Sequence, residues 1–191
     1  MASPLAELLA ALSSAFADLG VRWYLFGAQA AIVHGAARLT ADVDVTVELS
    51  ERPTRELVNG LARHGFALRV ADADEFVERT RVLPIVHRVS QMPVDVVLAG
   101  PGLEELFLDR AQPTEVAGVE LPVARAEDLI VMKILAGRPK DEQDVVAILN
   151  ARGQSLDLGE VESLLKTLEQ AIDQSDLVPR LRALQRAASR R

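Results

Sequence analysis

The stretch Trp23–Glu48, WYLFGAQAAIVHGAARLTADVDVTVE, is the most informative part of this chain. Its first residues, Trp23–Phe26, are apolar and aromatic, which is typical of a buried strand. Gly27 follows, and its backbone can turn tightly because it has no Cβ. A short helix is expected from Ala28, with Gly35 at its end. The unpaired N–H groups at the start of such a helix attract phosphate.

The second part of this stretch alternates between polar residues and valine. This alternation places Asp42 and Asp44 on one face of a strand, with Cα atoms about 6.5–7 Å apart. Two carboxylates aimed at one point repel each other unless a cation lies between them, and hard oxygen ligands select Mg²⁺ or Mn²⁺. The alternative interpretation is an edge strand with an acidic solvent face.

Asp95 is the third candidate carboxylate, because it lies within the apolar run Val94–Leu98. A charged group among core residues needs a partner, and a metal held by Asp42 and Asp44 on a neighbouring strand would supply one. The alternative is a strand-start aspartate that is satisfied by a local turn after Pro93.

The spacing of these residues resembles the signature of the polymerase-β-type nucleotidyltransferase superfamily. Gly27 follows an apolar residue, and thirteen residues separate Ala28 from the pair Asp42 and Asp44. The chain departs from the pattern at Ala28, where the superfamily has a second glycine or a serine. Only backbone N–H groups are therefore left there to bind a phosphate. The resemblance implies that Asp95 is the third carboxylate, which the superfamily carries on a later strand.

Within this superfamily, the chain is most similar to the bacterial AbiEii-type nucleotidyltransferases, many of which are toxins of type IV toxin–antitoxin systems. The similarity lies in Phe26–Ala30, His34, Gly35, Arg38, Thr40 and the segment Arg125–Asp144. It implies transfer of NMP from an NTP, and it assigns Lys133 to the triphosphate. It also implies RNA or protein as the acceptor and a cognate antitoxin as a possible partner.

Two basic residues are candidate nucleotide ligands. Lys133 follows Leu129 and Ile130 by one helical turn, so its ammonium is expected to emerge from an apolar face and to reach the triphosphate. The alternative is a lysine that snorkels from an amphipathic helix. Arg38 lies in the loop before the aspartate pair, where it is expected to hold a phosphate or the acceptor, or to form a salt bridge to a carboxylate.

Some polar residues near these motifs receive no role from the sequence. Lys140, Asp141 and Asp144 lie at the start of the next helix, where favourable electrostatics with the helix dipole explain acidic residues without any function. His34 precedes Gly35, which is typical of a residue that ends a helix.

Composition bounds the class of protein. The chain has 191 residues, of which 49% are hydrophobic, and this is enough for an α/β core with a small helical annex. It has no cysteine and three histidines, which excludes disulfides and makes an oxygen-bound metal the expected one. The net charge of −7 argues against a protein that coats DNA. No basic leader or membrane-length apolar run is present, so the expected location is the cytoplasm, without membrane contact.

The predicted architecture is an α/β nucleotidyltransferase lobe over residues 1–124, with a mixed, mostly antiparallel sheet and flanking helices. A helical C-terminal lobe follows over residues 125–191, and the nucleotide is expected between the two. The first lobe is predicted to contain a helix from Ser3 to Gly20, a helix after Pro53, the strand Phe66–Val70, a turn or short helix at Asp72–Glu78, paired strands at Val82–His87 and Val94–Leu98, a short helix to Ala111 and a hairpin at Glu115–Leu121.

Three classes of function are consistent with these residues. The first is a toxin-like enzyme that modifies RNA or protein, and the second is an enzyme that adenylylates a small molecule such as an aminoglycoside. The third is a binding protein with a decayed site, and the complete carboxylate trio argues against it. The acidic balance favours a cationic small molecule, whereas the AbiEii-like segment and the arginine-rich tail Leu177–Arg191 favour the toxin class.

Overall fold

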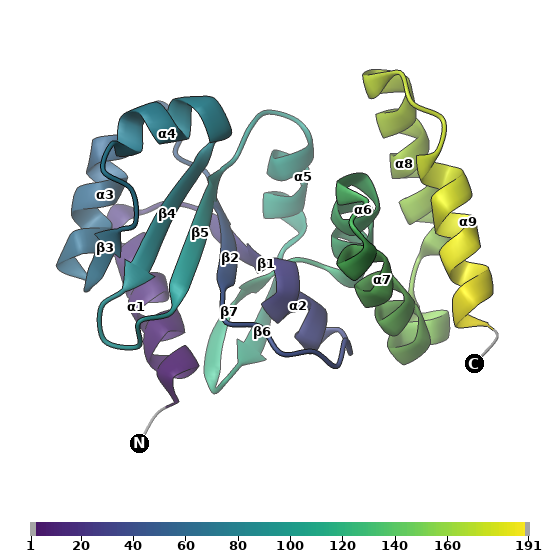
Figure 1. The fold of residues 1–191 in the computed structure, drawn as a ribbon, viewed down its shortest axis with the longest axis horizontal. Helices are drawn as coiled ribbons and strands as arrows, with labels where there is room; N and C mark the ends of the chain where they lie inside the picture. Colours follow the sequence, from purple (N-terminus) through teal and green to yellow (C-terminus); the bar gives the residue numbers. More distant parts are fainter. Residues whose placement is uncertain (1–2, 190–191) are drawn as a thin grey trace. The chain divides into compact units, whose positions relative to one another are not determined.

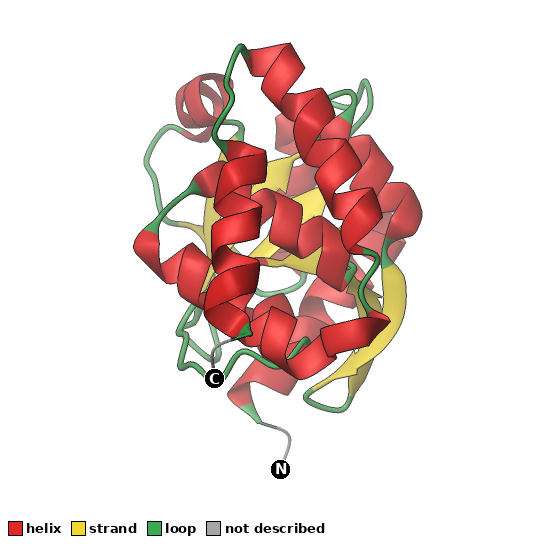
Figure 2. Ribbon diagram, turned by 90° about the vertical axis from the view of Figure 1, so that its right-hand side faces the viewer, coloured by secondary structure: helices red, strands yellow, loops and turns green. Residues whose placement is uncertain are grey.

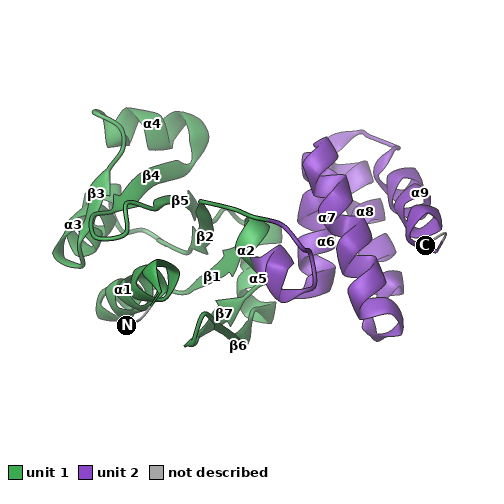
Figure 3. Ribbon diagram, turned by 60° about the horizontal axis from the view of Figure 1, so that its bottom comes forward, with its two compact units in different colours: residues 1–29, 39–124 green, residues 30–38, 125–191 purple. Residues whose placement is uncertain are grey.

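The structure is a computed structural model that describes residues 3–189. The chain forms two compact units (Figure 3). Unit 1 contains the chain up to Gln29 together with Leu39–Ala124, and unit 2 contains Ala30–Arg38 together with the chain from Arg125 onward. The short segment Ala30–Arg38 therefore belongs with the C-terminal helices, although it lies early in the sequence.

Unit 1 is built on a seven-stranded sheet with the strand order β3-β4-β5-β2-β1-β7-β6 (Figure 1). The expected mixed, mostly antiparallel sheet is confirmed, because four neighbouring pairs are antiparallel and two, β1 with β7 and β2 with β5, are parallel. The strands are β1 (Trp23–Phe26), β2 (Val43–Val47), β3 (Phe66–Leu68), β4 (Val82–His87), β5 (Pro93–Leu98), β6 (Gln112–Val116) and β7 (Val119–Val123).

One face of the sheet is packed by the first helix, α1 (Pro4–Leu19). The Ser3 hydroxyl accepts a hydrogen bond from the Ala6 N–H at 3.1 Å, and Gly20 ends the helix in the left-handed conformation, as expected for N-cap and C-cap residues. The helix packs against α3 (Thr54–Arg63) and β7, and its apolar stripe is buried. This stripe consists of Leu8, Leu9, Leu12, Ala15 and Phe16.

The remaining helices of unit 1 are α4 (Ala73–Thr80), which packs on β4, and α5 (Leu103–Arg110). The side chain of Asp72 accepts a hydrogen bond from the Glu75 N–H at 3.0 Å and begins α4, so the acidic segment forms a helix rather than a turn. The expected strand at Phe66–Val70 is shorter and ends at Leu68.

The regular structure described in unit 2 is entirely helical (Figure 2). The helix α6 (Ala126–Ala136) packs on α7 (Pro139–Arg152) and on α8 (Leu158–Ile172), and a 3-10 turn, Gly153–Ser155, follows α7. The last helix, α9 (Leu177–Ala188), packs on α7 and α8 through buried Leu177, Val178, Leu181 and Leu184.

The helix α2 (Gly27–Val33) begins in unit 1 and ends in unit 2. Its end is held within unit 2 by close packing, because a Cβ added at Gly35 would lie 2.2 Å from the Cβ of Ala151 on α7. Arg152 also donates a hydrogen bond to the His34 ring at 3.0 Å. These contacts explain why Ala30–Arg38 belongs with the helices.

Candidate active site

The start of α2 lies directly against the carboxylate of Asp44. Gly27 has a φ of +66°, and a Cβ added there would lie 1.9 Å from Asp44 Oδ2. This proximity follows from the antiparallel pairing of β1 with β2, which sets Phe26 opposite Asp44. Only glycine fits here, because any side chain would displace the aspartate.

Asp44 and Asp95 are brought side by side by the sheet. They are register partners on the neighbouring parallel strands β2 and β5, so their side chains leave the same face. On the opposite face, Val43, Val45 and Val94 are fully buried. The period-2 alternation of two separate strands thus aims two carboxylates at one region of unit 1.

Asp42 lies one residue before β2 and is exposed. The hydroxyl of Thr40 donates a hydrogen bond to its carboxylate. Within the described residues, no group of three or more acidic, histidine or cysteine side chains is gathered closely enough to hold a metal ion. The structure therefore assembles two of the three predicted acids and keeps the third at the entry to the strand.

Asp95 has a partner that the sequence did not indicate. Arg69, which follows β3, donates a hydrogen bond and forms an ion pair with the Asp95 carboxylate. Pro84 on β4 explains this contact, because it is the register partner of Asp95 and its carbonyl accepts from the Arg69 N–H at 3.0 Å. The side chains of Arg69 and Asp95 are 36% and 41% exposed, so the pair is open to exchange with solvent or ligand.

The donor chemistry of this region fits a hard divalent cation. Asp44 and Asp95 present acceptor-only oxygens on one face, and such oxygens suit Mg²⁺ or Mn²⁺. Full coordination by the trio requires Asp95 to exchange Arg69 for the cation and Asp42 to approach Asp44. The metal assignment for Asp42, Asp44 and Asp95 stays a prediction.

Gly27 can be tested against a matched glycine. Gly20 has a similar φ of +61° but no atom within 4 Å of an added Cβ, whereas Gly27 has Asp44 in contact. We expect Gly20→Ala to cost about 1 kcal/mol of unfolding free energy through backbone strain alone. Gly27→Ala is expected to cost more and to lower transferase activity by about 10-fold or more, because it moves Asp44. Urea unfolding measures the stability of the two variants, and initial rates measure their activity. Equal effects of the two variants on activity would contradict the close contact between Gly27 and Asp44.

In unit 2, Lys133 does not emerge from the apolar face as expected. It is only 5% exposed, and its Nζ lies 2.7 Å from Asp144 Oδ2 and 3.5 Å from Asp141 Oδ1. The two acids are three residues apart on α7, so they share one helix face and point to the same lysine on α6. The alternative of a lysine that snorkels to solvent is contradicted by this burial, because the face of α6 that carries Lys133 packs against α7. The role of Lys133 in nucleotide binding stays a prediction.

Arg38 joins the same cluster. Its Nη1 lies 2.8 Å from Asp144 Oδ2, so Asp144 bridges a lysine and an arginine. Arg138 completes the group, with Nε 2.5 Å from Asp141 Oδ2. The salt-bridge alternative for Arg38 is therefore present, while its predicted contact with a phosphate or the acceptor is untested. The cluster of Arg38, Lys133, Arg138, Asp141 and Asp144 contains three cations and two acids.

The charges of this cluster determine the ionisation of Asp141. Burial alone would raise the pKa of Asp141, but the hydrogen bond from Arg138 and the nearby charges of Lys133 and Arg138 outweigh it and hold the pKa below its ordinary value. Asp141 therefore remains a carboxylate at neutral pH, and it does more than stabilise the start of α7. The three-residue spacing of Asp141 and Asp144, which places both on one helix face, was the sequence signal for their shared contact with Lys133.

Two of the arginines in the C-terminal tail make contacts within unit 2. Arg180 donates to the Ile134 carbonyl at 3.2 Å and to Asp176 at 2.9 Å, and Arg182 pairs with Glu162 at 2.8 Å. Arg190 and Arg191 lie outside the described residues. The described part of the tail is thus a helix with buried leucines, and two of its arginines are paired with acids of unit 2.

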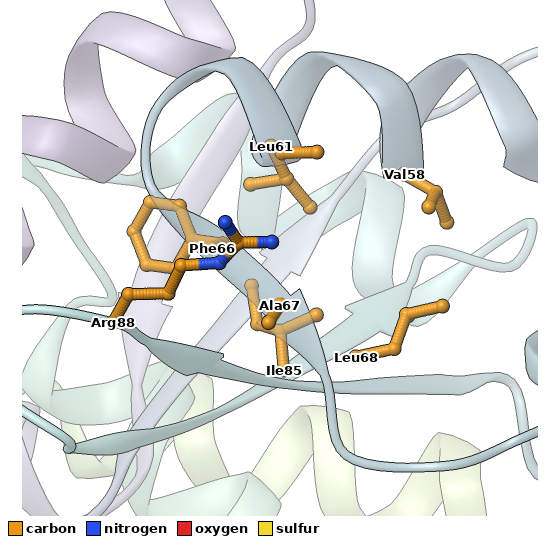
Figure 4. A pocket seen from close by; sticks show the side chains of 8 residues that line it. Val58, Leu61, Phe66, Ala67, Leu68, Ile85 and Arg88 are labelled. Atoms are coloured by element: carbon orange, nitrogen blue, oxygen red, sulfur yellow. The ribbon is translucent and has the colours of Figure 1, made fainter.

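An apolar pocket of about 190 Å³ lies elsewhere in unit 1, between α3 and the strands β3 and β4 (Figure 4). Leu61, Phe66 and Ile85 line it, and Arg88 is the charged group at its wall. No carboxylate is among its lining residues, so this pocket offers nothing to a cation. Among the described residues, no helix is long and apolar enough to cross a membrane.

Comparisons with known proteins concern the fold and the family of the chain. No curated relative matches the chain by sequence. The solution structure of the antibiotic-resistance factor ANT(2'')-Ia is similar, with a TM-score of 0.58 and 12% identity over 87% of this chain and 93% of that one. The lincomycin-bound crystal structure of the lincosamide antibiotic adenylyltransferase LnuA has a TM-score of 0.51 and 13% identity, over 74% and 94% of the two chains. At such identities the likeness concerns the fold alone.

A family model matches nearly the whole chain, over residues 5–185, and its description is "Nucleotidyltransferase of unknown function (DUF6036)". The match confirms the expectation of a nucleotidyltransferase, whereas the narrower resemblance to AbiEii-type enzymes stays a prediction. By this match, and in agreement with its fold, the chain belongs to the DUF6036 family of nucleotidyltransferases.

Proposed function

We propose that this protein transfers a nucleoside monophosphate from an NTP to a hydroxyl group of an acceptor and releases pyrophosphate. The observation that carries the proposal is the side-by-side placement of Asp44 and Asp95 on β2 and β5, with Asp44 against Gly27 at the start of α2. Membership of a nucleotidyltransferase family supports the reaction class.

In the proposed reaction, the acceptor oxygen attacks the α-phosphorus, and the bond from that phosphorus to the oxygen bridging to the β-phosphate breaks. Asp95 accepts the hydroxyl proton, and pyrophosphate leaves with the bridging oxygen. Asp42 and Asp44 are the proposed holders of Mg²⁺ or Mn²⁺, with Asp95 as a further ligand. A bound cation supplies charge neutralisation for the triphosphate.

The proposed nucleotide ligands act through backbone and side-chain donors. The N–H groups at Gly27 and Ala28 donate to phosphate oxygens, because the first N–H groups of a helix have no partner within the helix. Arg38 and Lys133 supply positive charge, and both belong to the ion cluster of unit 2. In this proposal Asp144 holds both cations in place, so a change at Asp144 acts on both.

Two acceptor classes are kept in this proposal. RNA, such as tRNA, or protein is the acceptor of a toxin-type enzyme with a cognate antitoxin, and the AbiEii-like segment Arg125–Asp144 supports it. A small molecule is the acceptor in the alternative, which the net charge of −7 supports. Two structural neighbours are, by their names, an antibiotic-resistance factor and a lincosamide adenylyltransferase, and they share the fold of this chain.

The reaction is tested by incubating the protein with each of the four α-labelled NTPs and Mg²⁺. The potential acceptors are total RNA, cell protein and the low-molecular-weight fraction of a bacterial extract. Transfer of label to any of them, with release of pyrophosphate and loss on addition of EDTA, is the expected result. No label in any fraction, with either Mg²⁺ or Mn²⁺, would contradict the proposed reaction and favour a nucleotide-binding protein.

A further inference from the structure

A groove of about 390 Å³ lies in unit 1 next to Asp95, with its walls formed by α4, β4 and the residues that follow β3. Figure 1 shows α4 beside β4, and the contacts of α4 with β4 agree. Its volume falls within the range of small-molecule sites, roughly 300–1,000 Å³. Neither the sequence motifs nor the comparisons assign a role to this groove.

The position of the groove follows from strand register. Asp95 on β5 pairs with Asp44 on β2 at one side and with Pro84 on β4 at the other. Pro84 and Asp95 both line the groove, whereas Gly27 contacts Asp44. The groove therefore adjoins Asp95 on the side away from Asp44 and Gly27. An attacking hydroxyl opposite the leaving pyrophosphate needs such a position, because phosphoryl groups transfer in line.

The walls of the groove are mainly apolar. Val70, Val82 and Pro84 contribute aliphatic surface, and Phe76 on α4 presents a ring that is 36% exposed. An exposed phenyl ring in a groove is suited to cover an apolar part of a ligand. The polar residues are Thr80, Arg69 and Asp95. Arg69 and Asp95 form an ion pair, so a hydroxyl that binds Asp95 replaces Arg69 there.

The helix that forms one wall is strongly acidic. Asp72, Asp74, Glu75 and Glu78 are all exposed on α4 or at its start, against two arginines, Arg79 on the helix and Arg81 at its end. Like charges repel a phosphate backbone and attract an amine over distances up to a Debye length. None of these acids lines the groove itself, so they act on a ligand at a distance, and their excess on α4 favours a cationic ligand over RNA.

We propose that this groove binds the acceptor, and that the acceptor is a small hydroxyl-bearing amine with an apolar face. This inference rests on the proposed nucleotidyl transfer. The apolar face packs on Phe76, the amine is attracted by the acids of α4, and the hydroxyl reaches Asp95. Asp95 takes the hydroxyl proton as the new bond to the α-phosphorus forms and pyrophosphate leaves.

The first arm of the test uses the labelling reaction with three acceptor pools: total RNA, cell protein and the low-molecular-weight fraction of a bacterial extract. We expect label in a product of the low-molecular-weight pool. We also expect this labelling to be lost when the pool is first passed over a cation-exchange resin, because the resin removes the amine acceptor. Label only in RNA or protein would overturn this inference and leave the proposed reaction intact. No label in any pool would contradict the proposed reaction itself.

The second arm compares two exposed apolar residues. Phe76 is in the groove, whereas Leu68, which is 37% exposed, lines the other pocket of unit 1. Phe76→Ala is expected to raise the half-saturating amount of the low-molecular-weight pool about 10-fold, which is the order expected for loss of a partly buried phenyl contact. The KM for NTP should not change, and Leu68→Ala should leave both values unchanged. Equal acceptor saturation in Phe76→Ala and wild type would overturn the assignment of the groove.

Discussion

Asp44→Asn is expected to lower the rate of nucleotidyl transfer by at least about 10²-fold. Asparagine has nearly the same shape as aspartate, so the packing against Gly27 is kept while the negative charge is lost. The charge matters because Asp44 and Asp95 are the two acids that the sheet places side by side. The measurement is the initial rate of label transfer at saturating NTP and Mg²⁺.

The control for this variant is Asp173→Asn. Asp173 is an exposed residue that ends α8 in the left-handed conformation, which asparagine also tolerates. Its replacement removes one charge without touching β2 or β5, so activity should stay near the wild-type value. Thermal unfolding of both variants shows whether they fold. A folded Asp44→Asn with wild-type turnover would contradict the catalytic role of the carboxylate pair.

Lys133→Met is expected to cost about 3–5 kcal/mol of unfolding free energy, the range for breaking a buried ion pair by removing one partner. Lys133 is only 5% exposed, and its ammonium lies between Asp141 and Asp144, which are 2% and 4% exposed. Methionine fills most of the space but leaves two buried carboxylates facing it. Arg38 and Arg138 still contact these acids, and for that reason we expect the lower part of this range.

Lys166→Met is the matched control. Lys166 pairs with Glu162 at 2.8 Å on the surface of α8, where its side chain is 58% exposed. An exposed pair of this kind contributes at most about 1 kcal/mol. Urea unfolding compares the two variants, and the double variant Lys133→Met/Asp144→Asn should recover part of the loss because it removes one stranded charge. Equal stability of Lys133→Met and Lys166→Met would show that the cluster does not stabilise unit 2.

The sequence alone was sufficient for the elements whose signals are local. The period-2 pattern of Asp42–Glu48 predicted β2, and Ser3 with Gly20 predicted the ends of α1. The paired strands β4 and β5 and the hairpin of β6 and β7 were also expected, because each pair is close in the chain. Such signals need only neighbouring residues, since propensity, capping and alternation act over a few positions.

Contacts between distant residues were decided by tertiary structure. The register of β2 on β5 joins Asp44 to Asp95, and β4 brings Arg69 to the same carboxylate. A shift of either strand by one residue would turn its acid to the other face, so the site depends on a register that the valines set by packing. Likewise, one face of α6 is buried against α7, and this packing encloses Lys133. A helical pattern shows on which face of α6 the lysine lies, but not which other helix covers that face. The sequence by itself thus singled out the candidate site residues, and the packing of strands and helices determined which of them meet.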